Sequence, residues 1–262
     1  MFTISGALRE SPKRHNSGLT EGSFIDGAPP YSLVESGKME IREIILHERR
    51  RGDCYKLLSA CFYLPQKILY LEEDLFQNLT MLLKTICPEA AIFSVEMEKA
   101  IHKYSDESLA IEYAKLFVGP FELKAPPYGS IYLDQGRRVM GDSTLEVRKM
   151  FEEAGLSMDE RFKELPDHIS VELEFMYYLT HREVEALENS EMDKALSLKE
   201  RGEVFLNRFL RQWVPPFCAK IKESTENEFY KALADCVLSF LNHSGDGNMS
   251  DLIIREKPLV RE

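Results

Sequence analysis

The sequence has 262 residues, of which 44% are hydrophobic, and a formal net charge of −11. A chain of this length and composition can bury one substantial core or two smaller lobes, so it is predicted to be globular. Its 44 acidic and 33 basic side chains argue against nucleic acid as the main partner, because phosphate binding needs clustered lysine and arginine. The balance suits a basic peptide better, and it is also an ordinary means of staying in solution.

The five cysteines form no Cys-x-x-Cys pair, so neither a disulfide framework nor a zinc ribbon is indicated. Cys54 and Cys61 fall on the apolar side of a predicted helix, where cysteine usually acts as a small buried hydrophobe. No apolar run reaches the roughly 18 residues that span a bilayer, and residues 1–19 contain no continuous hydrophobic stretch. We therefore expect a cytoplasmic protein without stable membrane insertion.

The two ends of the chain differ in composition from its middle. Residues 1–38 carry glycine, serine, proline and scattered charges without an apolar period, which predicts a flexible N-terminal tail. One hypothesis is that Met39 is the initiator, in which case these residues would not belong to the native product. We expect the folded domain to span residues 39–242 and a polar C-terminal tail to span 243–262.

The first predicted helices are marked by apolar residues at helical spacing. The first stripe starts at Cys54 and ends at Leu64, before a proline that disfavours helical geometry in the preceding residue. A second stripe runs from Leu75 to Ile86. Ser105 is predicted to cap a third helix, which has acidic residues in its first turn and ends before Gly119-Pro120.

Further helices follow at residues 143–154 and 166–187. The first opens with the capping box Ser143-x-x-Glu146 and closes at Gly155. In the second, Pro166 lies near the first turn, where its missing N–H costs nothing.

Two aromatic stripes predict the last helices. One contains Phe205, Phe209 and Trp213 and is expected to end at Pro215-Pro216. The other runs from Phe229 to Phe240. Strand signals are nearly absent, so the predicted class is all-α: a single helical-bundle-like domain, with two helical lobes joined by a hinge as the alternative.

Residues 119–142 lack helical period between two well-marked helices. A connection this long inside a compact domain is uncommon and is usually functional or disordered. Its content of Phe121, Pro127, Tyr128 and Tyr132 is too apolar for a solvated loop. We predict a long ordered loop that packs on the helices.

Signatures of common enzyme chemistry are missing. The sequence contains no phosphate-binding loop, dinucleotide fingerprint, nucleophile elbow or His-Glu-x-x-His pair. His168 and Glu172 are four residues apart on one helix face, where they could bind a metal or share a proton. The alternative is that Asp167 caps the helix, His168 bonds locally and Glu172 pairs with a basic neighbour. Two candidate ligands do not make a metal site, so we predict no metal, cofactor or catalytic residue.

Several segments together resemble a known family, in order and over about residues 49–241. They are Glu112-Tyr113-x-x-Leu116-Phe117-Val118-Gly119-Pro120, Ala125-Pro126-Pro127-Tyr128-x-Ser130-x-Tyr132, Met140-Gly141-x-Ser143-Thr144, Pro166-Asp167-His168-x-x-x-Glu172-Leu173-x-Phe175-Met176, Phe205-Leu206, Trp213-Val214-Pro215 and Phe229-Tyr230-x-x-Leu233-Ala234. The series resembles the TorD/DmsD-type maturation chaperones, related to NarJ, of molybdenum-containing oxidoreductases.

The resemblance implies an all-helical chaperone that binds the twin-arginine signal peptide of a molybdopterin oxidoreductase and retains its catalytic subunit until the cofactor is inserted. It assigns signal-peptide binding to Tyr128, Ser130, Tyr132, Asp167 and His168, and Glu172 joins them as a carboxylate that could pair with arginine. A twin-arginine leader presents guanidinium groups beside an apolar stretch, so its receptor needs carboxylates next to an apolar surface. Asp134 and Glu174 are further candidates for the carboxylates.

Three matters stay open at this level. A small metal-dependent enzyme built on His168 and Glu172, or an adaptor that docks folded subunits, would be the alternative function. The client reductase cannot be named, and no nucleotide site is predicted. A monomer and a domain-swapped homodimer are both compatible with helical lobes.

Overall fold

The structure is a computed structural model, and it describes residues 7–10, 31–119, 123–136, 138–159 and 162–243. Within these ranges the protein is predominantly helical, as predicted, with one two-stranded antiparallel sheet. No helix of the described part combines the length and the apolar character needed to cross a bilayer.

Local sequence signals set the limits of the N-terminal helices. These are α1 (Tyr31–Ala60), α2 (Lys67–Glu72), α3 (Leu75–Ile86), α4 (Pro88–Lys103) and α5 (Asp106–Tyr113), the last continuing as a π-helical turn at Ala114–Val118. Ser105 caps α5 as predicted, because its hydroxyl accepts a hydrogen bond of 3.1 Å from the backbone N–H of Ser108. Pro88 opens α4 in the first turn, where its missing donor is harmless.

One of the C-terminal helices, α10, extends further than the sequence predicted. They are α6 (Ser130–Leu133), α7 (Asp142–Glu153), α8 (Ile169–Glu188), α9 (Met192–Phe205), α10 (Arg211–Ser224) and α11 (Glu228–His243), with a π-helical turn at Leu206–Leu210. The expected end at Pro215-Pro216 is wrong, since both prolines lie inside α10. Burial of Trp213, Phe217 and Ile221 on one side of α10 outweighs the missing backbone bonds.

The strands were not predicted. β1 (Leu8–Glu10) pairs antiparallel with β2 (Leu156–Met158), with Leu8 opposite Met158. Three-residue strands are too short to show an alternating pattern in the sequence. β1 and the start of α1 both fall within residues 1–38, where the sequence predicted a tail, so residues 8–10 and 31–38 have regular secondary structure. The predicted C-terminal tail lies outside the described residues, apart from His243 at the end of α11.

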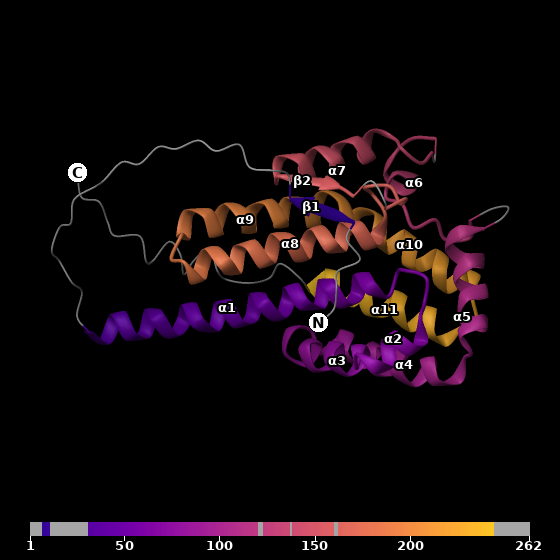
Figure 1. Cartoon of the computed structure of the whole chain (residues 1–262), viewed down its shortest axis with the longest axis horizontal. Coiled ribbons are helices and arrows are strands. Elements are labelled where there is room, and N and C mark those ends of the chain that lie inside the picture. Colours follow the sequence, from indigo (N-terminus) through magenta and orange to yellow (C-terminus); the bar gives the residue numbers. More distant parts are fainter. Residues whose placement is uncertain (1–6, 11–30, 120–122, 137, 160–161, 244–262) are drawn as a thin grey trace.

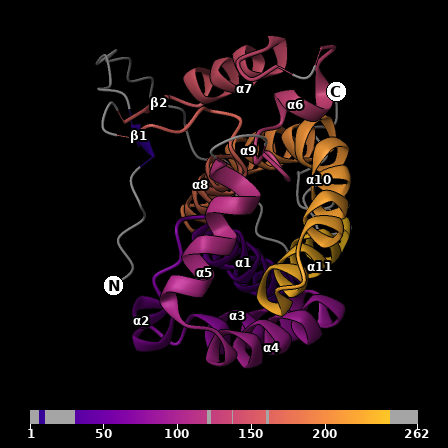
Figure 2. The ribbon, with the colours of Figure 1, turned by 90° about the vertical axis from the view of Figure 1, so that its right-hand side faces the viewer.

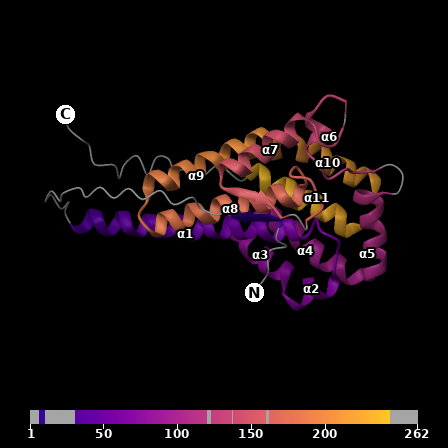
Figure 3. The ribbon, with the colours of Figure 1, turned by 45° about the horizontal axis from the view of Figure 1, so that its top comes forward.

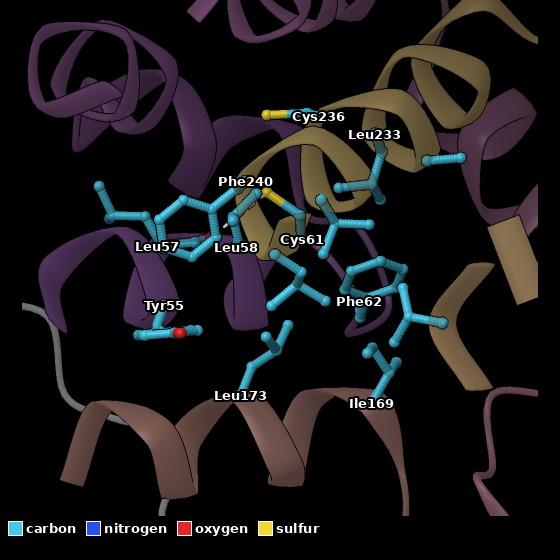
Figure 4. Packing of buried hydrophobic residues seen from close by; sticks show 14 of the residues in the cluster. Tyr55, Leu57, Leu58, Cys61, Phe62, Ile169, Leu173, Leu233, Cys236 and Phe240 are labelled. Carbon is cyan, nitrogen blue, oxygen red and sulfur yellow. Dashed lines mark hydrogen bonds between the residues drawn. The ribbon is translucent and has the colours of Figure 1, made fainter. Parts of the chain in front are cut away.

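The helices surround one main hydrophobic core, and a small second cluster lies between α8 and α9. α1, α8 and α9 lie side by side along the long axis, and α3 and α4 pack beneath α1 and α11 (Figures 1 and 3). Seen from the end, α5, α10 and α11 complete the enclosure (Figure 2). One cluster of buried hydrophobic residues runs from α1 to α11, and Figure 4 shows α1, α8 and α11 contributing to it. This continuity supports a single domain. Cys54 and Cys61 lie in this core, as predicted.

The segment 119–142 packs on the helices through its described residues, as expected. Ala125 is fully buried, and its N–H donates to the carbonyl of Leu116 at 2.9 Å. The capping box after this segment is a correction. Ser143 lies inside α7, and its N–H and hydroxyl both donate to the carboxylate of Asp134. Asp134 thus binds the N-terminus of α7, so the cap comes from the loop and not from the helix's own sequence.

Candidate functional site

The candidate site lies where the 123–136 loop meets the first turn of α8. His168 is the N-cap of α8, because its Nδ1 accepts a hydrogen bond of 3.2 Å from the N–H of Ser170. The hydroxyl of Ser170 lies 2.7 Å from the same nitrogen. The sequence had suggested Asp167 as the cap, and the structure assigns that place to His168 instead.

Asp167 joins the loop to α8. Its Oδ2 accepts a hydrogen bond of 2.8 Å from the N–H of Ser130, and its carbonyl accepts one of 2.9 Å from Gly129. In return, Ile169 donates its N–H to the carbonyl of Pro127 at 2.9 Å. Tyr128 and His168 form an antiparallel bridge in the middle of this exchange. Backbone hydrogen bonds therefore run in both directions between the loop and the start of α8.

Glu172 connects the same turn to α10. Its Oε2 accepts a hydrogen bond of 2.9 Å from the indole N–H of Trp213. The ring of Tyr132 stacks on Trp213 with centroids 5.7 Å apart, and its hydroxyl donates to the carbonyl of Pro126 at 2.9 Å. Gly129 fits against this pair, since a Cβ there would lie 3.1 Å from Nε1 of Trp213. Loop, α8 and α10 thus meet at one point.

Tyr128 covers the outer side of His168. Their rings meet edge to face at 5.3 Å, and the tyrosine hydroxyl donates a hydrogen bond of 2.6 Å to Glu164. Burial raises the pKa of Tyr128, and the bond to the Glu164 carboxylate raises it further. The hydroxyl accordingly stays a donor at physiological pH.

Burial sets the charge of the two central groups. It lowers the pKa of His168 to about 3, so the imidazole is neutral near pH 7. It raises the pKa of Glu172 well above its usual value, and the charge of Asp167 acts in the same direction against the bond from Trp213. This environment favours a neutral histidine and a protonated glutamate.

One atom of each residue in the metal-site alternative already has a hydrogen-bond partner. His168 uses Nδ1 for its own helix cap, and Glu172 uses Oε2 for Trp213. In the part of the chain that the structure describes, no three His, Cys, Asp or Glu side chains are grouped to hold a metal ion.

The structure brings the six predicted site residues together, but most of them are inaccessible. Ser130 and Glu172 are fully buried, and Asp167 and His168 are 1% and 2% exposed. Tyr128 and Tyr132 are partly exposed. The two further carboxylates also have partners, since Asp134 binds Ser143 and Glu174 accepts a 2.7 Å bond from Tyr63. In the described conformation the four buried residues hold the 123–136 loop in place, and Tyr128 and Tyr132 are the two site residues that are partly exposed.

Three members of the site were missed in the sequence. Trp213 and Gly129 complete the contact with Glu172, and Glu164 binds Tyr128. Trp213 is the only tryptophan of the chain, and the sequence patterns placed it on a helix face and in the family series but not in the site. No local pattern indicates that it lies against residues of α8.

Comparison with known proteins identifies the family of the chain. The family model described as "Nitrate reductase delta subunit" matches residues 71–219, more than half of the chain and all of the candidate site. The chain belongs to this family. The resemblance to TorD/DmsD-type maturation chaperones is thereby confirmed, since the curated relatives carry those names.

Three relatives show the extent of the similarity. The chaperone protein TorD of Vibrio parahaemolyticus is 30% identical over 132 residues, which cover 50% of this chain and 60% of the relative. The Tat proofreading chaperone DmsD of Salmonella typhi is 29% identical over 154 residues, covering 57% and 63%. The TorD of Vibrio cholerae is 22% identical over 227 residues, covering 82% and 99%. The chain thus spans less than two thirds of the length of the first two relatives.

Proposed function

We propose that the protein is a cytoplasmic chaperone for a molybdopterin-containing oxidoreductase. In this proposal it binds the twin-arginine signal peptide of the catalytic subunit and assists cofactor insertion before export. The observation that carries the proposal is the match to the family over residues 71–219, with relatives named as TorD chaperones and as Tat proofreading chaperones. The match includes the loop, the first turn of α8 and Trp213.

Charge is compatible with such a client. The chain carries a net charge of −11, and a twin-arginine leader is cationic. Opposite net charges raise the rate of encounter and favour pairing of guanidinium groups with carboxylates. An enzyme would instead need a reactive group, whereas His168 and Glu172 are both buried and bonded within the protein.

Two classes of residue carry the proposed site. Tyr128 and Tyr132 offer partly exposed aromatic rings on the 123–136 loop for the apolar part of a leader. The four buried members act as positioning residues, because each fixes the loop, α8 or α10 and leaves little surface for direct contact: Ser130, Asp167, His168 and Glu172. They would contact a leader directly only if the loop moved away.

The decisive experiment compares a precursor with its mature form. The catalytic subunit with its leader and the same subunit without it are each titrated into the chain, with binding followed by calorimetry. The proposal expects removal of the leader to weaken binding at least tenfold. Equal affinity for both forms would contradict it and would favour the adaptor that docks folded subunits.

Metal analysis of the purified protein tests the enzymatic alternative. A stoichiometric, tightly held transition metal would favour a metal-dependent enzyme over the chaperone. The oligomeric state, monomer or domain-swapped homodimer, stays a prediction that sedimentation analysis would decide.

A further inference from the structure

The strand β2 and the outer face of α8 form a groove that holds an extended segment of the chain itself. β1 adds to β2 in antiparallel register, and the N–H of Asp159 donates to the carbonyl of Ala7 at 2.8 Å (Figures 1 and 2). In the described part of the chain β2 has no other strand partner. Without β1, its backbone N–H and C=O groups would be an open edge, which is a template for any extended peptide.

The side chains of this segment fill specific places. Ala7 is fully buried, which leaves room only for a small residue there. Leu8 lines a cavity of about 260 Å³ together with Leu156, Tyr177 and Tyr178. Arg9 reaches back to Asp159, with Nη2 and Oδ2 2.6 Å apart. The groove therefore accommodates a small residue, an apolar residue and an arginine at three successive positions.

The charges around the groove favour a cationic occupant. The carboxylate of Asp159 is 6% exposed, whereas Arg9 is 55% exposed. A cation stabilises a nearly buried carboxylate, and the guanidinium of Arg9 supplies both the charge and the matching donors. The cavity lining also includes Glu174, and it includes Glu185, which lies 2.8 Å from Arg182 and 3.4 Å from His181. The groove thus combines a partly apolar cavity, a strand edge that β1 occupies and the carboxylate of Asp159.

We propose that this groove binds the arginine-bearing part of the client leader as an added strand, and that residues 7–10 occupy it when no client is present. This inference rests on the proposed function and assigns the leader a place that the loop residues do not provide. A leader carries arginine beside an apolar stretch, as the bound segment carries Arg9 beside Leu8. Since the segment and the leader compete, release of the segment exposes the site.

The test uses the full chain with substitutions that act on one partner only. Leu8→Asp places a charge in the apolar cavity and frees the groove, and Arg9→Ala removes the ion pair alone. A labelled twin-arginine leader peptide is titrated into each protein. If residues 7–10 occupy the groove in most molecules, only the remaining fraction can bind the leader, and the apparent affinity is reduced to that fraction of the intrinsic affinity. Leu8→Asp should therefore tighten leader binding about three- to tenfold. Arg9→Ala should tighten it about twofold.

The contribution of Asp159 is measured in the freed groove. Adding Asp159→Asn to Leu8→Asp should weaken leader binding at least threefold relative to Leu8→Asp alone, because the guanidinium loses its charged acceptor. Arg148→Ala is the matched control, since Arg148 is an exposed arginine on α7 paired with Glu152 and lies outside the groove. It should leave the affinity unchanged. A peptide of residues 5–12 should displace the leader from the Leu8→Asp protein.

The outcomes separate this inference from the proposed function. Leader binding of equal affinity in wild type, Leu8→Asp and Arg9→Ala overturns the groove assignment and leaves the leader proposal standing. No leader binding by any of the proteins overturns the leader proposal and with it the choice of partner for the groove. Thermal unfolding of each variant shows whether it is folded. If Leu8→Asp is misfolded, the affinity of Arg9→Ala, which changes a largely exposed side chain, decides between the outcomes.

Discussion

The indole N–H of Trp213 donates a hydrogen bond of 2.9 Å to Oε2 of Glu172, and this bond ties α10 to the first turn of α8. Both side chains are fully buried. Tyr132 of the 123–136 loop stacks on the same indole, so the loop depends on the pair for its position. The surface proposed to contact the client is thus supported by two buried side chains, Glu172 and Trp213.

Glu172→Gln should stabilise the protein relative to wild type as the pH rises. Burial raises the pKa of Glu172 above its ordinary value of 4.5, so the stability that its neutral form provides is complete below pH 4.5 and is lost as the pH rises through the raised pKa. Glutamine stays neutral and can still accept from Trp213. The difference should grow by at most about 1.4 kcal/mol per pH unit over that interval.

Urea unfolding of both proteins at pH 5 and pH 8 measures this difference. Glu96→Gln is the control, because Glu96 is an exposed glutamate on α4. A pH-independent difference for Glu172→Gln, like that of the control, would show that Glu172 is ionised in the folded protein.

Gly129→Ala should lower the free energy of unfolding by about 1–3 kcal/mol, as expected for overpacking. The backbone there allows alanine, since φ is −57°, but the new methyl group would lie 3.1 Å from Trp213. Gly202→Ala is the matched control. In α9 its Cβ would meet only Met176 at 3.8 Å, so it should stabilise the protein by about 0.5–1 kcal/mol. Effects of equal sign in chemical unfolding would refute the tight contact at Gly129.

Asp167→Ala should destabilise the protein by about 1–3 kcal/mol, because the buried N–H of Ser130 loses its acceptor. Asp167→Asn keeps a carbonyl oxygen in the same place and should cost clearly less. Asp142→Ala, at an exposed position in the first turn of α7, should cost only a few tenths of a kcal/mol. If Asp167→Ala were as mild as Asp142→Ala in urea unfolding, the loop would not depend on this bond.

His168→Asn should make the protein less sensitive to acid than wild type is. The pKa of His168 is about 3 in the folded protein and ordinarily 6.5, so its contribution is present above pH 6.5 and is lost as the pH falls toward 3. Between pH 7 and pH 5 wild type should lose about 2 kcal/mol that the variant keeps, since asparagine can still cap α8 without titrating. His102→Gln, at an exposed position, is the control. Parallel pH dependence of wild type and His168→Asn would contradict a buried neutral imidazole.

Sequence patterns predicted the features that neighbouring residues decide. The cap at Ser105 and the stripe from Leu75 to Ile86 depend on residues within one or two turns, and the structure confirms both. The predicted end at Pro215-Pro216 failed because the burial of Trp213 is set by elements far along the chain.

The candidate site shows the same limit. The resemblance brought Asp167, Ser130 and Glu172 to attention, but it could not show that they bond across 37 and 41 positions to the loop and to α10. Nor could it show that these groups are buried, and their direct contact with a client therefore stays a prediction. β1 escaped prediction because three residues pair with a strand about 150 positions away.

Arginine recognition is the central claim, and one pair of peptides tests it most directly. A synthetic twin-arginine leader and the same leader with both arginines replaced by lysine are titrated into the wild-type chain at physiological salt. Lysine keeps the charge but lacks the planar, two-pronged donors that match a carboxylate. The account predicts saturable binding of the arginine leader and at least about tenfold weaker binding of the lysine leader. Equal binding of the two peptides, or no binding of either, would contradict it.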